Sequence, residues 1–523
     1  MTSRLRLSED NRRWWTLGAM CFALFMVMLD NTVVNVALPS IQRDFNASLS
    51  ALEWTVNAYT LTFAVLLVTG GRLGDIFGRR RMFLFGVVVF AIASATIGFA
   101  PTDGWLVASR AVQGVGAAFM MPGTLSIITN AFPASERGRA IGTWAGVSAI
   151  ALALGPVVGG WLTEDVSWRA IFFINVPVAV GAIAITLFAA RESRDESVDR
   201  RVDVPGIVAL TVGLTALVLA LVESNAWGWG SARILGLLTV AVVALAAFVR
   251  IERRSPVPVV DFAFFRSRSF LGANIVAFAV SFAMLAMFFF IALYMQNILG
   301  YTPLQAGVRF LPSTLLIMVA APLAGRLTDR VGPRPLVAGG LALCAVAMAW
   351  FSRIDVDSGY GYLLPAFIVM GIGMGLTMSP MSTAAMNAVH RSKAGVASGT
   401  LSMSRMVGGT FGVAVLGAIV ATVGRSELEK LLPALPAGAR ERLVDGLGSG
   451  AVTAGVPADV AAAAKQAFVS ALGDGLTLSA AVAAAAALIA WFMIAPGKAE
   501  APVTAEHQAV TDAEAAPAPV RAS

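Results

Sequence analysis

Apolar residues gather along this chain in long runs, which short polar segments separate. Most runs extend for about 20 residues, the length that an α-helix needs to cross a membrane. A window of this length predicts about fourteen spanning helices, at residues 15–38, 52–72, 82–100, 104–129, 138–162, 168–190, 205–222, 231–250, 270–296, 304–326, 335–353, 360–386, 396–423 and 472–495. Because the first run is followed by others of its kind, we interpret it as a retained span and not as a signal peptide.

Composition supports this prediction and excludes several functions. Of 523 residues, 57% are hydrophobic and 13% are charged, whereas soluble proteins carry about 25% charged residues. The sequence therefore predicts an all-α polytopic membrane protein. Cys21 and Cys344 lie in apolar runs, so we expect neither a disulfide nor a bound metal. The chain has no GxxxxGK[ST] phosphate loop and no cluster of a nucleophile with a base, so we expect no enzymatic activity and no cofactor.

Lysine and arginine concentrate in alternate loops, before the first predicted span and after the second, fourth, eighth, tenth and twelfth. With an even number of spans these loops lie on one side, and the positive-inside rule places that side and both termini in the cytoplasm. The rule also explains the net charge of +7 without a nucleic-acid partner. We expect a multi-pass protein of the cell membrane that works as a monomer in the lipid bilayer.

Charge runs divide the chain into parts. Residues 12–190 are predicted to form an N-terminal six-helix bundle, and residues 266–497 a C-terminal one. Residues 191–265 hold a charged linker and an inserted two-helix hairpin. Residues 424–475 are predicted as a loop on the outer side, and the Ala-, Pro- and Glu-rich residues 498–523 as a disordered cytoplasmic tail.

An internal repeat relates the two bundles. GRLGDIFGRR at residues 71–80 and GRLTDRVGPR at residues 325–334 share the pattern G-R-L-x-D-x-x-G-x-R, and each follows an even-numbered span. Related halves are typical of secondary transporters, whose substrate site lies between the halves at mid-membrane. The sequence therefore predicts a transporter made of two repeats.

The repeat also suggests a gate. Glycine permits a tight turn and close helix contact, and an aspartate can accept hydrogen bonds from a helix N-terminus or an arginine. A latch of this kind, formed in one conformation and broken in the other, would open and close the cytoplasmic side. A static turn is the alternative. The candidate gate residues are Gly71, Asp75, Gly78, Arg79, Arg80 and Asp329.

A carboxylate lies inside the first predicted span, in LDNTVVNVALP at residues 29–39. A charge there costs about 3 kcal/mol or more, so Asp30 indicates an ion or substrate path, with a polar tie between helices as the alternative. At 1.5 Å per residue, Asp30 lies about 12 Å and Arg110 about 9 Å below the same surface. We expect the two to share a site in which proton binding neutralises Asp30 and releases Arg110.

Other polar residues within predicted spans are candidates for a cavity lining: Asn31, Asn35, Gln113, Asn274, Gln296 and Arg405. The amides could equally hydrogen-bond between helices. Arg405 is harder to explain in that way, because it carries a charge deep within the span at residues 396–423.

The fifth predicted span contains Gly155-Pro156, followed by Gly159 and Gly160. A proline inside a helix removes a backbone hydrogen bond and favours a kink, while clustered glycines give a partner helix a flat surface. This segment is a candidate hinge, with static close packing as the alternative.

Several of these segments together resemble the major facilitator superfamily, across about residues 12–496. GRLGDIFGRR resembles its loop signature, RAVQGVG at residues 110–116 its fourth-helix motif, and the Gly155-Pro156 segment its exporter motif. LDNTVVNVALP and WRAIFFINVP at residues 168–177 are similar to motifs of its fourteen-helix drug:proton antiporters, the EmrB/QacA drug-resistance family.

The resemblance implies export of small hydrophobic or cationic compounds, driven by inward proton flow, with Asp30 as the proton-coupling acid and Arg110 in proton transfer. It implies a cytoplasmic gate at Asp75 and Arg79, and an exporter hinge at Gly155 and Pro156. The second copy of the loop carries Pro333 where the first carries Arg79, so we expect only the first copy to play the full gate role.

We therefore predict a proton-coupled antiporter that exports drugs, antibiotics or secondary metabolites. Two alternatives stay open. The same fold could take up a polar nutrient with protons, or the protein could be a membrane sensor or scaffold that does not transport. In the last case, replacing Asp30 or Arg110 would leave its function intact.

Overall fold

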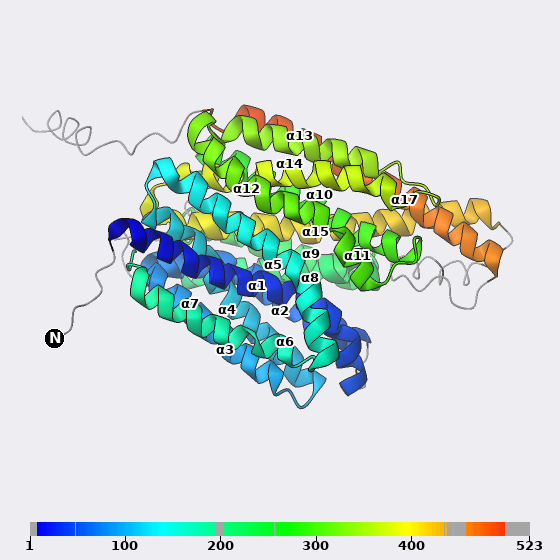
Figure 1. Cartoon of the computed structure of the whole chain (residues 1–523), viewed down its shortest axis with the longest axis horizontal. Coiled ribbons are helices and arrows are strands. Elements are labelled where there is room, and N and C mark those ends of the chain that lie inside the picture. The colour runs from blue at the N-terminus through cyan, green and yellow to red at the C-terminus, as the bar shows by residue number, and fades with distance from the viewer. Residues whose placement is uncertain are drawn as a thin grey trace, which may run out of the picture.

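The computed structural model describes residues 8–496 except 46, 48, 195–201, 256–257, 261, 434, 437–442 and 444–456. Its helices lie side by side along one direction (Figure 1). The first half contains α1 (Glu9–Phe45), α2 (Leu49–Phe77), α3 (Arg79–Gly98), α4 (Asp103–Ala131), α5 (Arg137–Asp165), α6 (Ala170–Phe173) and α7 (Asn175–Ala189). A hairpin of α8 (Val204–Trp227) and α9 (Ala232–Glu252) follows. The second half contains α10 (Arg268–Asn297), α11 (Pro303–Arg309), α12 (Leu311–Val331), α13 (Pro333–Phe351), α14 (Tyr360–Asn387), α15 (Ala394–Leu431) and α17 (Ala458–Met493).

The prediction of an all-α polytopic membrane fold is confirmed. In the described part of the chain, 13 helical segments are long and apolar enough to cross a membrane, with α6 and α7 together forming one of them. The fifth predicted span corresponds to α5, a helix of 29 residues that packs between α1 and α12.

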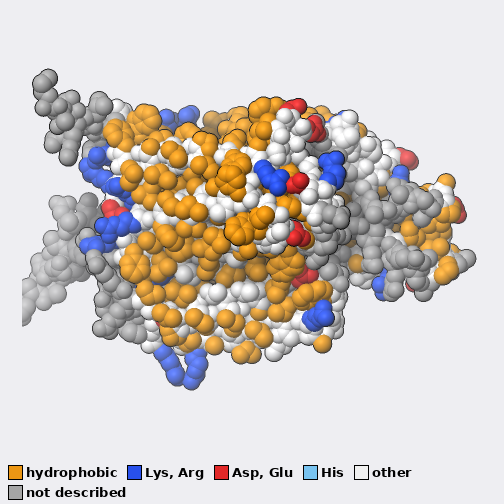
Figure 2. Space-filling view, turned by 90° about the horizontal axis from the view of Figure 1, so that it is seen from below, with side chains coloured by type: hydrophobic (Ala, Val, Ile, Leu, Met, Phe, Trp, Pro, Cys, Tyr) orange, Lys and Arg blue, Asp and Glu red, His pale blue; other side chains and the backbone are white. Residues whose placement is uncertain are grey.

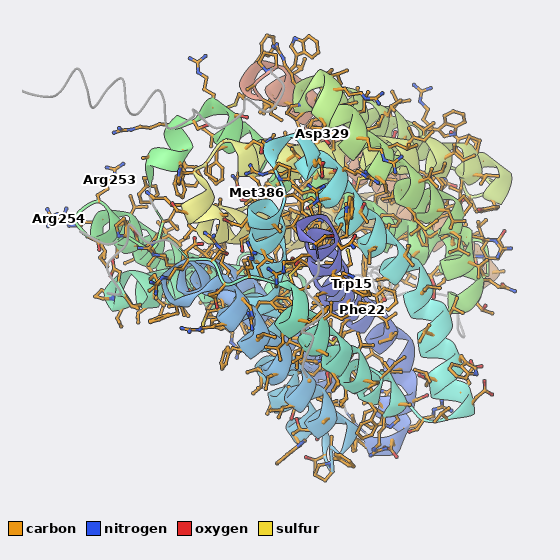
Figure 3. All side chains as sticks on the ribbon, turned by 60° about the vertical axis from the view of Figure 1, so that its left-hand side comes forward. Trp15, Phe22, Arg253, Arg254, Asp329 and Met386 are labelled. Carbon is orange, nitrogen blue, oxygen red and sulfur yellow. The ribbon has the colours of Figure 1, made fainter. Side chains whose placement is uncertain are left out.

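The outer surface of the bundle is apolar, as contact with lipid requires. Figure 2 shows a broad hydrophobic surface with Lys and Arg side chains at its left-hand edge, and with Lys, Arg, Asp and Glu side chains mixed toward its right-hand end. Trp15 and Phe22 of α1, labelled in Figure 3, are 51% and 48% exposed. Arg253 and Arg254, beyond the end of α9, extend away from the bundle in the same view. We call the end that carries Arg80, Arg81, Arg139, Arg330 and Arg334 the basic end.

The two halves meet along two helix pairs. α2 packs against α15, and α5 packs against α12, so each contact joins the first half to the second. The α8–α9 hairpin lies beside the first of these contacts, because α8 packs against both α2 and α15. Val65 and Val68 of α2 and Val396 of α15 share a buried cluster with Leu210 and Leu214 of α8.

The predicted outer loop at residues 424–475 needs correction. α15 continues to Leu431 and α17 already begins at Ala458, so both helices extend well into this segment. Figure 1 shows α17 projecting past the bundle. The prediction was wrong at both edges, because α15 and α17 continue beyond the apolar runs that set its limits. Pro457 precedes the first residue of α17. The polar residues Lys465 and Asp474 lie within α17, because a helix that extends out of the membrane can carry charged side chains. The predicted tail at residues 498–523 lies outside the described residues.

Candidate functional site

The carboxylate of Asp30 is buried and accepts hydrogen bonds from polar side chains of two other helices, α4 and α7. Arg110 Nη1 donates to its Oδ2 at 2.5 Å. Gln113 Nε2 donates to its Oδ1 at 2.9 Å, and Asn175 Nδ2 donates to the same oxygen at 3.1 Å. Asp30 has no exposed surface. Both carboxylate oxygens are therefore satisfied, as a buried charge requires.

Arg110 is held by more than its ion pair. Its Nε donates to the Thr55 carbonyl oxygen at 3.0 Å, and Nη1 also donates to Gln113 Oε1 at 2.6 Å. The guanidinium carbon lies 4.3 Å from the ring centroid of Tyr59, a distance at which the aromatic face attracts a cation. The pair that we expected between α1 and α4 is thus formed.

The helical spacing of α4 explains how two of its residues reach one carboxylate. Arg110 and Gln113 are three residues apart and so share a face of the helix. Gln113, which we predicted only as a candidate for lining a cavity, belongs instead to the Asp30 network. Its side chain is completely buried, and its Nε2 also donates to Ser94 Oγ at 2.7 Å.

The sequence did not identify Asn175 and Ser94 as members of this site. Asn175 stands in the WRAIFFINVP segment, at the start of α7, and donates to both Asp30 and Ser94. The position of Asn175, a polar residue within a long apolar run, was the one feature of the sequence that could have identified it. Ser94 on α3 gave no comparable signal, because serine is common in membrane helices.

The first copy of the repeated loop joins the two halves at the basic end. The N–H groups of Gly395 and Val396, in the first turn of α15, donate to the two Asp75 carboxylate oxygens at 2.9 and 2.8 Å. A helix N-terminus is a favourable site for an anion. Arg79 donates to Asp75 Oδ1 at 2.8 Å through Nε, and to the Ser392 carbonyl oxygen.

The other predicted gate residues have different contacts. Gly78 adopts φ of +112°, which glycine accommodates best, and Gly332 at the same place in the second copy adopts +83°. Arg80 donates to the Ala190 carbonyl oxygen at 3.2 Å and therefore stays within the first half. Its own N–H donates to Glu192 Oε1 at 3.0 Å.

The second copy, with Pro333 at the position of Arg79, forms a similar latch without an arginine contact among the described residues. That only the first copy plays the full gate role stays a prediction. The N–H groups of Gly138 and Arg139, in the first turn of α5, donate to the Asp329 carboxylate oxygens at 3.1 and 3.2 Å. Figure 3 shows Asp329 at the end of the bundle where α5 begins. We predicted Asp329 as a gate residue, but a single sequence did not reveal its partner helix.

Glycines let the halves approach closely at the same end. A Cβ atom on Gly71 would collide with the Gly395 carbonyl group, and one on Gly325 would collide with that of Gly138. Arg137 of α5 also donates to Asn387 Oδ1 of α14 at 2.8 Å. These contacts close the basic end in this structure.

The candidate hinge packs against the helix that carries Asp30. A Cβ atom on Gly155 would collide with Thr32 of α1, and one on Gly159 would lie 3.0 Å from Val33 Cα. Gly160 has open space at the same position. Pro156 lies within the continuous helix α5, and its side chain is outside the described set.

The remaining candidates fall into two groups. Asn274 of α10 is buried, donates to the Phe270 carbonyl oxygen and accepts a hydrogen bond from Ser404 Oγ of α15, so it ties two helices together. Asn31, Gln296 and Arg405 are partly exposed. The side chain of Asn35 lies outside the described residues.

An exposed ion pair links helices at the end opposite the basic end. Arg169 Nη1 donates to Asp44 Oδ2 at 2.6 Å, and Trp168 Nε1 donates to the same oxygen at 3.0 Å. The hydrogen bond from Arg169 lowers the pKa of Asp44 below its usual range, and that from Trp168 lowers it further. This contact fixes the short segment between α5 and α6 onto the end of α1.

Comparison with known proteins agrees with this architecture. The family model described as Major Facilitator Superfamily matches residues 20–413. The tetracenomycin C resistance and export protein of Streptomyces glaucescens is 37% identical over 495 residues, which cover 92% of this chain and 91% of that protein. The puromycin resistance protein pur8 of Streptomyces alboniger is 39% identical over 415 residues, covering 78% and 82%.

Solved structures show the same fold at much lower identity. The proton:xylose symporter XylE bound to 6-bromo-6-deoxy-D-glucose superposes with a TM-score of 0.63 at 13% identity, covering 96% of this chain and all of that one. The family match, the two relatives and the superposition agree with the paired bundles, so the chain belongs to the major facilitator superfamily.

Proposed function

We propose that this protein exports antibiotics, drugs or related secondary metabolites across the cell membrane, in exchange for protons. The observation that carries export is the 37% identity, over 92% of the chain, to a protein named for tetracenomycin C resistance and export. Relatives named for puromycin resistance and cephamycin export, the latter 36% identical, support the same class of substrate.

Proton coupling is supported by the chemistry of the Asp30 site. Protonation of the carboxylate would remove the charge that Arg110 pairs with, and an unpaired buried charge is strongly unfavourable. The network would then rearrange, and α1 and α4 with it. Asp30 has no exposed surface here, so proton exchange requires another conformation in which water reaches it.

The two latches support alternating access. Asp75 and Asp329 each accept from the first turn of a helix in the opposite half, and these contacts must break before the basic end can open. We assign the basic end to the cytoplasm because of the positive-inside rule. In this assignment both termini are cytoplasmic, and the structure represents the state closed to the cytoplasm. A single chain supplies both halves of the site, so we propose a monomer.

Uptake of a polar nutrient has less support. The likeness to a xylose symporter is at 13% identity and therefore concerns the fold alone. The direction of transport is tested by loading cells that express the protein with a panel of dyes and antibiotics. We expect lower accumulation than in control cells, and restoration of accumulation by an uncoupler. Higher accumulation in expressing cells would contradict export, and export that an uncoupler does not affect would contradict proton coupling.

A further inference from the structure

Arg405 is an arginine deep in the membrane helix α15. It lies eleven residues after the start of α15, about 16 Å along the helix at 1.5 Å per residue. That depth is near the middle of a hydrocarbon core of about 30 Å. Among the described residues, none forms a hydrogen bond or ion pair with Arg405, and its side chain is partly exposed.

The spacing along α15 shows which way Arg405 faces. Val396 and Met403 pack in the cluster that includes the α8–α9 hairpin. Arg405 follows Val396 by nine residues and Met403 by two, which at about 100° per residue places it on the opposite side of the helix. It therefore faces away from the hairpin. Gly408 and Gly412 follow Arg405 by three and seven residues and so share its stripe, and both pack against the backbone of α10, at Phe278 and Phe282. Arg405 therefore lies on the side of α15 next to α10, and α15 also contacts α4 of the first half.

Two serines continue the same face. Ser398 and Ser402 precede Arg405 by seven and three residues, spacings that bring side chains onto one stripe of a helix. Ser398 is fully buried, and its Oγ has no hydrogen-bond partner among the described residues. A buried hydroxyl without a partner is unfavourable. The stripe thus offers one charge and two hydroxyl groups that the described protein does not satisfy.

Four acids of the described spans have partners other than Arg405, and Glu223, buried in α8, belongs to the hairpin that Arg405 faces away from. Asp30 pairs with Arg110, and Asp75 pairs with Arg79. Glu252 accepts from the N–H groups of Val259 and Val260 beyond the end of α9, and Asp329 accepts from the start of α5. An isolated cation inside a membrane is costly unless an anion or water reaches it.

We propose that Arg405 binds an acidic group of the exported compound, a carboxylate or an ionised phenol, while Ser398 and Ser402 hydrogen-bond its polar substituents. This assignment rests on the proposed export function and narrows its substrates from hydrophobic or cationic compounds to hydrophobic anions. Guanidinium suits this role because its planar donors match a carboxylate.

Binding of two dyes with the same xanthene ring system tests the assignment. Carboxyfluorescein is an anion and tetramethylrhodamine methyl ester is a cation, and fluorescence anisotropy with the full-length protein in nanodiscs measures the affinity for each. We expect the wild-type protein to bind carboxyfluorescein at least about tenfold more tightly, the size of one charge-assisted hydrogen bond. Arg405→Gln should remove that preference without weakening rhodamine binding, and Arg405→Lys should retain part of it.

Arg353→Gln is the matched control, because it removes the same charge from an exposed position and should leave both affinities unchanged. Tighter binding of the rhodamine than of carboxyfluorescein by the wild-type protein would overturn the assignment. This comparison uses the wild-type protein alone, so it does not depend on whether a variant folds. An equal loss of affinity for both dyes in Arg405→Gln would also overturn the assignment. So would a loss of carboxyfluorescein affinity in Arg353→Gln as large as that in Arg405→Gln. The proposed function is tested separately: uncoupler-sensitive efflux of the rhodamine but not of carboxyfluorescein would leave export standing and remove only the anion assignment.

Discussion

Asp30 of α1 and Arg110 of α4 form an ion pair at 2.5 Å, and neither side chain is more than 1% exposed. Removing one member of such a pair costs about 3–5 kcal/mol, because the other charge remains buried without a partner. Replacing both members by neutral groups of similar shape costs much less. This difference separates the structural contribution of the pair from its part in proton coupling.

Asp30→Asn should insert into the membrane but lose transport driven by a pH gradient, since asparagine cannot bind and release a proton. Its thermal midpoint should fall, because Arg110 loses its counter-charge. The double variant Asp30→Asn with Arg110→Gln should recover much of the midpoint while remaining uncoupled. Everted vesicles with an imposed pH gradient, together with thermal unfolding in detergent, measure both effects. Normal pH-driven transport by Asp30→Asn would refute the coupling role.

The two latches predict a shift between conformations. Asp75→Ala removes two hydrogen bonds to the start of α15 and the ion pair with Arg79, each worth about 1.5–3 kcal/mol when a charge is involved. The basic end should therefore open more often. A cysteine at Ser392, in a background lacking Cys21 and Cys344, should then react faster with a maleimide. Asp329→Ala should have a smaller effect, because it removes no arginine contact. Labelling equal to that of the parent in both variants would show that the latches do not control closure.

Part of the Asp30 site could be predicted from the sequence, because a charged residue within an apolar run is costly in a membrane and therefore indicates a function. Asp30 and Arg110 were both conspicuous for that reason, and the helical rise gave their similar depth. The repeated loop likewise identified Asp75 and Asp329. Asn175 and the partners of Asp329 could not be predicted, because backbone N–H groups and neutral amides leave no distinctive pattern in a single sequence. Their positions depend on how α5, α7 and α12 pack.

The helix boundaries differ from the predictions for a related reason. A hydropathy window finds the part of a helix that lies in lipid and ends where polar residues begin. α15 and α17 continue beyond that point, since lysine and glutamate favour a helix as much as leucine does. Hydropathy therefore predicted the number of spans better than their lengths.

Two glycines of the candidate hinge provide a matched pair. Gly155→Ala would bring a methyl group against Thr32 of α1, whereas Gly160→Ala would place one in open space. Gly155→Ala should lower the thermal midpoint and transport, because α1 and α5 can no longer pack as closely. Gly160→Ala should be neutral, or stabilising by up to about 1 kcal/mol through helix propensity. Equal effects of the two substitutions on efflux and on the midpoint would contradict close packing as the role of Gly155.

The ion pair between Asp44 and Arg169 predicts a pH dependence of stability at the end opposite the basic end. The pKa of Asp44 is lowered in the folded protein, chiefly by its hydrogen bond from Arg169. A carboxylate with a lowered pKa stabilises the fold above its unfolded pKa of about 4, and this contribution is lost as the pH falls through the folded pKa. Because the side chains of Asp44 and Arg169 are 42% and 34% exposed, the contribution should be about 0.2–1 kcal/mol.

Arg169→Gln should lower the thermal midpoint slightly at pH 7, and the difference from the wild type should shrink as the pH falls below about 4. Raising the salt concentration at pH 7 should also reduce it. A difference that stays constant from neutral to acidic pH would show that Arg169 acts through its packing on Trp168, 4.3 Å from the ring centroid, and not through the charge of Asp44.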